Sequence, residues 1–217
     1  GINGAFGPKS PKGINEKELL ISEMLKENGY STGIFGKWHL GSAEQFNPTM
    51  HGFDEFFGFC GGWMDYFDWW LERNGRRENA DGRYLTDVFT DEAIDFVTRH
   101  RHRPFFLSVM YNAPHTPLQA PDRDIKSYLD SGLSPGLAIT YAMNEVMDRG
   151  IAKIVETLDE LGLAEDTIVM FTSDNGPAFS LAGRPDQVPE GVSTDLRRYN
   201  CNFNGAKGSV YEGGIRV

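Results

Sequence analysis

Helical segments alternate with short apolar runs along this chain, and that alternation limits the folds that it can adopt. In chain order, the helical segments and apolar runs cover residues 15–29, 30–35, 86–100, 105–111, 136–161 and 167–172. Such an alternation predicts an α/β sheet with helices on both faces. The second and third apolar runs lack a polar–apolar alternation, so each is expected to be a strand buried on both faces.

The composition indicates one globular domain with an acidic surface. The chain has 217 residues, 12% of them aromatic, and a formal net charge of -10. An acidic surface attracts neither nucleic acid nor an anionic membrane, so neither partner is expected. No apolar run is long enough to span a membrane. Cys60 and Cys201 lie far apart without metal-ligand spacing, and we expect two unpaired thiols.

Reactive side chains follow the first two apolar runs. Lys37 and His39 come directly after the first run, and an extended loop would direct both to the same side. His115 follows the second run between Pro114 and Pro117, which restrict the backbone around it. The alternatives are an exposed lysine beside a packing histidine, and a purely structural His115. Ligands of open α/β sheets bind beyond the carboxyl ends of the strands, so the positions of these side chains favour a role in ligand binding or catalysis.

Oxygen donors and a further lysine occur after the third run. Asp174 and Asn175 supply a carboxylate and an amide, which suit Ca²⁺ or Mg²⁺, although a turn completed by Gly176 would use the same residues. Calcium takes six to eight oxygen ligands, so its other ligands must come from elsewhere. Lys207 lies among small residues, which would allow the backbone to approach a ligand closely. A flexible surface loop would have the same composition.

Together these side chains predict a pocket for a tetrahedral oxyanion. Lysines and a metal ion would spread the negative charge, and histidines would transfer protons. An acidic protein that handles an anion must concentrate its positive charge in such a pocket. The six candidates, all expected at one edge of one sheet, are Lys37, His39, His115, Asp174, Asn175 and Lys207.

Four motifs of the chain resemble motifs that occur in the same order in the type I sulfatases. The most specific is Gly-Lys-Trp-His-Leu-Gly at residues 36–41, and the others are Pro-His-Thr-Pro at 114–117, Thr-Ser-Asp-Asn-Gly at 172–176, and Gly-Ala-Lys-Gly at 205–208 followed by Glu-Gly-Gly. The resemblance extends over nearly the whole chain. It implies an alkaline-phosphatase-like α/β fold with a mostly parallel central sheet. It also implies that residues 1–217 are part of a catalytic domain that hydrolyses sulfate monoesters of aryl or carbohydrate compounds.

The resemblance also implies a role for each candidate residue. Asp174 and Asn175 would be ligands of calcium, which is preferred over magnesium. Lys37 and Lys207 would bind sulfate oxygens. His39 would lie beside the hydroxyls of the formylglycine nucleophile and assist sulfate release. His115 would contact the sulfate near the leaving oxygen, where together with Lys207 it could protonate the departing alcohol.

Two parts of the family's site are missing from the sequence. Neither Cys60 nor Cys201 begins the Cys/Ser-x-Pro/Ala-x-Arg motif that matures to formylglycine, and no serine does. The Asp-Asp pair of the family's first strand is also absent. We therefore expect an interior fragment without the N-terminal strand and the C-terminal subdomain, inactive by itself. The whole protein would need a sulfatase-maturing enzyme, and the family suggests a periplasmic, secreted or lysosomal location.

Two rival functions and one aromatic tract stay open at this point. The rivals are a phosphodiesterase or phosphonate monoester hydrolase of the same superfamily, and a non-catalytic sulfate-binding protein. The tract could pack a core or stack against sugars. Its members are Phe56, Phe57, Phe59, Trp63, Tyr66, Phe67, Trp69 and Trp70.

Overall fold

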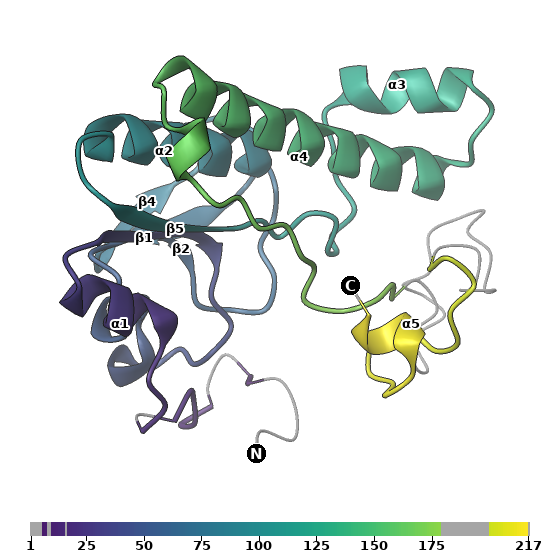
Figure 1. The fold of residues 1–217 in the computed structure, drawn as a ribbon. Coiled ribbons are helices and arrows are strands. Elements are labelled where there is room, and N and C mark those ends of the chain that lie inside the picture. Colours follow the sequence, from purple (N-terminus) through teal and green to yellow (C-terminus); the bar gives the residue numbers. More distant parts are fainter. Residues whose placement is uncertain (1–5, 8–9, 16, 179–199, 217) are drawn as a thin grey trace. The chain divides into compact units, whose positions relative to one another are not determined.

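A computed structural model describes residues 6–7, 10–15, 17–178 and 200–216 of the chain (Figure 1). The chain divides into two compact units. The first unit contains Gly1–Pro121 and Met143–Thr167, and the second contains Asp122–Ala142 and Ile168–Val217. None of the helices in the described ranges combines the length and apolar character needed to cross a membrane.

The regular elements follow the order predicted for an α/β fold. The strands are β1 (Ser31–Lys37), β2 (Glu55–Phe59), β3 (Trp70–Arg73), β4 (Arg76–Asn79) and β5 (Phe105–Met110). The helices are α1 (Ile21–Glu27), α2 (Leu85–His100), α3 (Asp122–Asp130), α4 (Pro135–Glu160) and α5 (Glu212–Ile215). Single turns of 3₁₀ helix cover Glu44–Phe46, Pro48–Met50 and Ala164–Asp166.

The first unit is built on one five-stranded sheet in the order β4-β3-β2-β1-β5. Strand β1 is parallel to both β2 and β5, so the expected parallel core is confirmed. Strands β3 and β4 add an antiparallel hairpin, which makes the whole sheet mixed. Asn74 and Gly75 connect the hairpin with φ values of 47° and 85°. Positive φ at both residues is what a two-residue hairpin turn requires.

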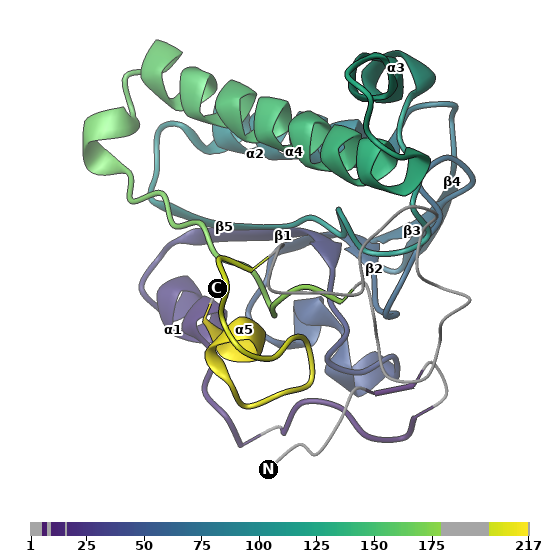
Figure 2. The same cartoon turned by 90° about the vertical axis from the view of Figure 1, so that its right-hand side faces the viewer.

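Helices cover both faces of this sheet, as predicted. Helix α1 lies on one face and α2 on the other (Figure 2). On the α2 face, Phe35 and Phe96 pack edge to face with ring centroids 5.7 Å apart. On the α1 face, Ile34 and Phe56 belong to a separate buried cluster. Consecutive residues of β1 are therefore buried on opposite faces, and both residues at this point of the strand, Ile34 and Phe35, are apolar.

Two expectations about strands are wrong in the structure. Residues 167–172 form no strand, and Ile168, Val169, Met170 and Phe171 are 89%, 58%, 87% and 74% exposed. Strand β5 is half-buried and lies at the end of the described sheet rather than at its centre. An apolar run favours a buried strand only if neighbouring strands and helices cover it, and the run alone does not contain that information.

The first helix also starts later than its capping pattern predicts. The Asn15 side chain accepts a hydrogen bond from the Lys17 amide at 3.0 Å and so forms a turn. Helix α1 begins after Leu20, whose amide donates to the Glu23 carboxylate at 2.8 Å. Asparagine stabilises isolated turns as readily as helix starts, and here the turn is formed. Gly29 ends the helix as expected, with a φ of 85°.

Candidate functional site

The loop after β1 is held in place by Trp38. The Trp38 amide donates to the Phe59 carbonyl at 3.0 Å, which continues the pairing of β1 with β2. The buried Trp38 indole donates from Nε1 to the Phe46 carbonyl at 2.7 Å. Because the tryptophan is anchored in this way, the half-buried side chains of Lys37 and His39 start from a fixed backbone.

His39 departs from the extended loop that the sequence suggested. Its φ is 55°, in the left-handed region, so alternation of side chains does not apply at this residue. The imidazole Nε2 lies 3.2 Å from the Phe6 carbonyl oxygen. The ring also lies close to Gly62, where an added Cβ would lie 2.8 Å from His39 Cε1. The position of the ring is therefore set by residues far from it in sequence.

His115 lies in a compact turn after β5. Its amide donates to the Asn112 carbonyl at 2.7 Å, and its Nδ1 lies 2.7 Å from the Thr116 carbonyl oxygen. Gly36 of β1 pairs with Met110 of β5, and the two strands are parallel. Their carboxyl ends therefore share one edge of the sheet, and three predicted site residues lie there, one at the last position of β1 and two in the loops that follow β1 and β5. These are Lys37, His39 and His115.

Tyr66 stabilises the His115 turn, a role that the sequence did not reveal. Its hydroxyl donates to the His115 carbonyl at 3.0 Å, and its amide donates to Gln119 at 2.9 Å. Burial, reinforced by neighbouring Tyr84, raises the pKa of Tyr66, so the hydroxyl stays a neutral donor. The sequence identified Tyr66 only as one aromatic residue among eight. Nothing in the tract's spacing shows which ring reaches His115.

Two loops of the second unit carry its three candidate residues. We call residues 173–177 the Asp-Asn loop and residues 205–214 the Lys207 loop. They are joined by two backbone hydrogen bonds, from the Gly176 amide to the Gly214 carbonyl at 3.2 Å and from the Lys207 amide to the Pro177 carbonyl at 3.0 Å. The structure thus brings two distant sequence motifs together within this unit.

Glycine allows this close approach. A Cβ on Gly176 would collide with the Gly213 carbonyl oxygen. Just before the Lys207 loop, the buried Asn200 side chain donates from Nδ2 to the Gly205 carbonyl at 2.9 Å and to the Phe203 carbonyl at 2.9 Å. Small residues and one polar side chain therefore hold the two loops in place, without a strand in this part of the described chain.

The donor set of the Asp-Asn loop suits a hard cation but is incomplete. Asp174 is exposed, and the half-buried Asn175 amide donates from Nδ2 to the Gly176 carbonyl at 3.0 Å. Among the described residues, no three His, Cys, Asp or Glu side chains are grouped to hold a metal. Two oxygen donors fit part of a calcium site, and the remaining ligands must come from elsewhere.

The two cysteines are free thiols, as expected. Cys60 packs against the core cluster on the α1 face. Burial, with a smaller contribution from the charge of Glu72, raises the pKa of Cys60 to about 12. A thiol with such a pKa stays protonated near neutral pH and is a poor nucleophile. Cys60 therefore lacks the reactivity expected of a catalytic nucleophile.

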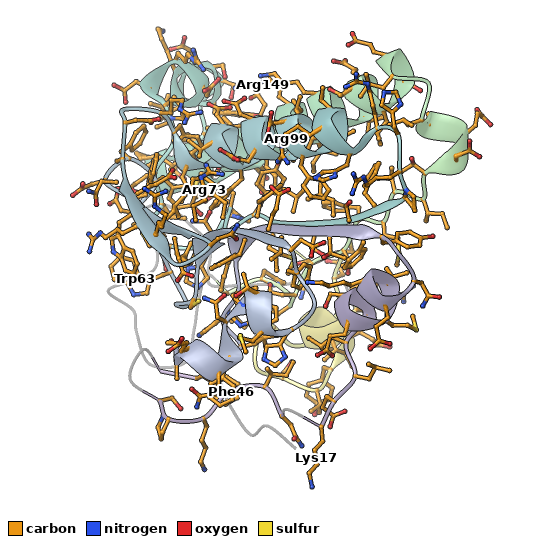
Figure 3. The ribbon with its side chains drawn as sticks, turned by 90° about the vertical axis from the view of Figure 1, so that its left-hand side faces the viewer. Lys17, Phe46, Trp63, Arg73, Arg99 and Arg149 are labelled. Atoms are coloured by element: carbon orange, nitrogen blue, oxygen red, sulfur yellow. The ribbon has the colours of Figure 1, made fainter. Side chains whose placement is uncertain are left out.

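Five of the eight aromatic residues in the tract pack the core, whereas Phe67, Trp70 and, most of all, Trp63 are exposed. Phe56, Phe57, Phe59, Tyr66 and Trp69 are each at most 3% exposed. Trp63 is 65% exposed, and Figure 3 shows it pointing away from the sheet. It directly follows Gly62, the residue that lies close to His39. Its position beside the Lys37–His39 loop gives the sugar-stacking hypothesis a specific residue.

The six predicted residues are divided between the two units. Lys37, His39 and His115 belong to the first unit, and Asp174, Asn175 and Lys207 belong to the second. Within each unit, the candidates lie in neighbouring loops. A single pocket formed by all six remains a prediction.

Comparison with known proteins gives concordant matches. Residues 2–217 match the profile of the family described as Sulfatase. N-acetylgalactosamine-6-sulfatase of Homo sapiens is 37% identical, over 94% of this chain and 39% of that protein. Arylsulfatase J of Mus musculus is 32% identical, over 97% of this chain and 35% of that protein. The chain therefore spans well under half the length of these curated relatives.

A solved structure is similar along almost the whole chain. It is a crystal structure of Ps i-CgsB in complex with k-i-k-neocarrahexaose. Its TM-score is 0.82 at 32% sequence identity, and the match covers 97% of this chain and 48% of that chain.

Proposed function

We propose, because this chain belongs to the sulfatase family, that the full-length protein hydrolyses sulfate monoesters. The family match extends over residues 2–217, and the similar solved structure has the expected alkaline-phosphatase-like α/β fold. The observation that carries the proposal most directly is the convergence of Lys37, His39 and His115 at one edge of the sheet. Lys37 is the last residue of β1, and the two histidines lie in the loops that follow the adjacent parallel strands β1 and β5.

In this proposal the first unit binds the sulfate and moves protons. The Lys37 ammonium offsets negative charge that builds up on the sulfate oxygens during S–O cleavage. His39 would accept the proton of the nucleophile's free hydroxyl as the sulfate leaves. His115, in the turn that Tyr66 anchors, donates a proton to the oxygen of the departing alcohol.

The second unit supplies the remaining charge. Lys207 binds a sulfate oxygen and assists His115 at the leaving group. Asp174 and Asn175 would contribute part of a calcium site, and the other ligands would come from elsewhere in the full-length protein. When present, the formylglycine supplies the nucleophile and calcium supplies positive charge. A maturing enzyme would produce the formylglycine, and a periplasmic, secreted or lysosomal location stays a prediction.

We further propose that the substrate is a sulfated carbohydrate rather than a simple aryl sulfate. The Trp63 indole is 65% exposed beside the residue that lies close to His39. An exposed aromatic face in such a place can stack on a sugar ring. The human relative is named N-acetylgalactosamine-6-sulfatase, and the similar solved structure is a complex with k-i-k-neocarrahexaose.

The test uses the full-length protein after maturation. We expect release of sulfate from 4-nitrophenyl sulfate and from a sulfated galactose or galactosamine oligosaccharide. Greater activity on bis(4-nitrophenyl) phosphate would favour the phosphodiesterase alternative. Binding of a sulfate ester without turnover, in a protein that lacks the maturation motif, would favour the non-catalytic alternative.

The carbohydrate part of the proposal has its own test. Trp63→Ala should raise KM for the oligosaccharide about 3- to 10-fold and leave 4-nitrophenyl sulfate unaffected, because one aromatic contact contributes about 0.5–1.5 kcal/mol. Trp70→Ala is the matched control. Trp70 is 47% exposed, but it lies on β3 and Arg77 sits over its ring at 4.8 Å. Equal losses on both substrates would show that Trp63 serves packing instead.

A further inference from the structure

We infer that Gly62 is a positioning residue, whose missing side chain leaves room for the His39 imidazole. An ideal Cβ at Gly62 would lie 2.8 Å from His39 Cε1 and 2.9 Å from His39 Nε2. Carbon atoms in contact normally lie about 3.5–4.0 Å apart. A side chain at residue 62 and the present ring position therefore exclude each other.

The steric conflict affects a particular edge of the imidazole. Its Nε2 is the atom that lies 3.2 Å from the Phe6 carbonyl oxygen. A methyl group at residue 62 would have to displace Cε1 and Nε2 by roughly 0.7 Å to restore ordinary contact. That displacement disturbs the contact with Phe6 and changes where the ring presents its nitrogens.

The ring yields more easily than the backbone. The atoms that would meet the Cβ belong to the far end of a side chain. Gly62 also lacks the left-handed φ that would make any side chain strained there. Gly62→Ala should therefore leave the fold intact and move His39. This inference rests on the proposed function for its effect on turnover, but its effect on the imidazole does not.

The adjacent glycine provides a matched control. A Cβ on Gly61 would have one neighbour, the Trp63 carbonyl oxygen at 4.0 Å, which is an ordinary contact. Gly61 also lacks a positive φ. Gly61→Ala makes the same chemical change one residue away, with no effect expected on His39.

The first measurement follows the imidazole directly. In full-length protein labelled with ¹⁵N-histidine, the His39 ring signals are identified by their loss in His39→Asn. We expect Gly62→Ala to shift these signals and Gly61→Ala to leave them in place. Unchanged signals in Gly62→Ala, or equal shifts in both glycine variants, would overturn the inference.

Turnover gives the second measurement. Misplacement of a catalytic group by about 1 Å can cost about 100-fold in rate. We expect Gly62→Ala to lower kcat by about 100-fold, with little change in KM, and Gly61→Ala to keep the wild-type rate. If the wild-type protein hydrolyses no sulfate ester, the proposed function fails, while the histidine signals still decide the role of Gly62.

A double-mutant comparison covers the case in which Gly62→Ala destabilises the protein. Asparagine tolerates the φ of 55° at residue 39 and lacks the ring atoms Cε1 and Nε2. If the imidazole causes the conflict, Gly62→Ala should lower the thermal midpoint of the wild type more than that of His39→Asn. An equal loss in both backgrounds would show that another neighbour is responsible, and the inference would be wrong.

Discussion

The two units position their candidate residues in different ways. In the first unit, Lys37 is the last residue of β1 and His115 follows the paired strand β5, and a core on both faces supports the sheet. In the second unit, Asp174 and Lys207 are in loops joined by backbone hydrogen bonds, while the apolar run from Ile168 to Phe171 is exposed. Paired strands set both the positions of their ends and the direction of the chain there. Two loops joined by backbone hydrogen bonds are fixed only relative to each other at the points where they touch.

This difference has a consequence for mutation. Damage to the sheet of the first unit should cost stability, because buried side chains on both faces depend on it. Changes in the loops of the second unit should cost much less stability. The proposed chemistry nevertheless requires both units. Mutations in the second unit should therefore lower activity with little loss of stability, whereas mutations in the sheet of the first unit should lower both.

The largest effect is expected from removal of a lysine in either unit. Lys37→Met and Lys207→Met should each lower kcat/KM for a sulfate ester by about 100- to 1,000-fold, because each removes a charge that stabilises the transition state. The thermal midpoint should change little. The measurement is steady-state kinetics of full-length protein, with Lys153→Met on α4 as the control for loss of a lysine. A normal rate in Lys207→Met would mean that the second unit takes no part in sulfate binding.

Thiol reactivity should also separate the two units. Cys60 in the first unit is partly buried, and its pKa is raised to about 12, whereas Cys201 in the second unit is exposed. We expect iodoacetamide at pH 8 to modify Cys201 about 100-fold faster, since the thiolate is the reactive form. Mass spectrometry of the two cysteine peptides over time measures both rates. Similar rates in native protein would show that Cys60 is more accessible than the structure indicates.

Adding a methyl group to a glycine should cost more stability in the sheet of the first unit than in a loop of the second. A Cβ on Gly58 in β2 would collide with the backbone carbonyl of Gly36 in β1. The strands would have to separate, so we expect Gly58→Ala to cost about 3 kcal/mol or more. A Cβ on Gly208 in the second unit meets no atom within 4 Å, although the φ there is 87°. Gly208→Ala should cost only about 1–2 kcal/mol of left-handed strain.

Thermal and denaturant unfolding of the two glycine variants provide this measurement. If Gly208→Ala proved the more harmful, the loops of the second unit would be more tightly constrained than their open surroundings indicate.

Regular elements were the most predictable part of the fold. The pattern of residues 86–100 predicted α2 to within one residue, since its apolar face repeats at helical spacing. The run 105–111 likewise predicted β5, but not its position at the end of the described sheet. A strand's neighbours are set by long-range pairing. The run 167–172 shows the same limit, because its apolar sequence did not produce a strand.

The sequence predicts the residues of the candidate site but not the neighbouring residues and backbone conformations that hold them in place. Residue types and positions after strands identified Lys37, His39 and His115. The sequence does not reveal Tyr66, whose hydroxyl bonds to His115, or Gly62, whose lack of a side chain leaves room for His39. In both cases the partner is distant in sequence. The left-handed φ of His39 was also missed, since the pattern assumed an extended loop. Such features depend on packing between segments, which local spacing does not encode.

The smallest expected effect is the loss of stability when one partner of an ion pair is removed, and this loss should be larger in the first unit than in the second. In the first unit, both Glu55 oxygens accept hydrogen bonds from Arg99, at 2.8 and 2.7 Å. In the second, Lys126 and Asp130 form a pair on α3 in which both side chains are more than 60% exposed. We expect Glu55→Gln to cost about 1 kcal/mol at pH 7, allowing for solvent screening of the partly exposed Arg99. Asp130→Asn should cost about 0.3 kcal/mol or less.

The pH dependence of that cost tests its origin. Hydrogen bonds from Arg99 lower the pKa of Glu55, burial opposes this, and His100 adds to it. A carboxyl whose pKa is lower in the folded protein stabilises the fold fully above its unfolded pKa, and this contribution is lost as pH falls through the folded pKa. The difference in thermal midpoint between wild type and Glu55→Gln should thus be constant from pH 6 to 8 and shrink below about pH 4. A difference that persists at pH 3 would show that Glu55 acts through packing rather than through charge.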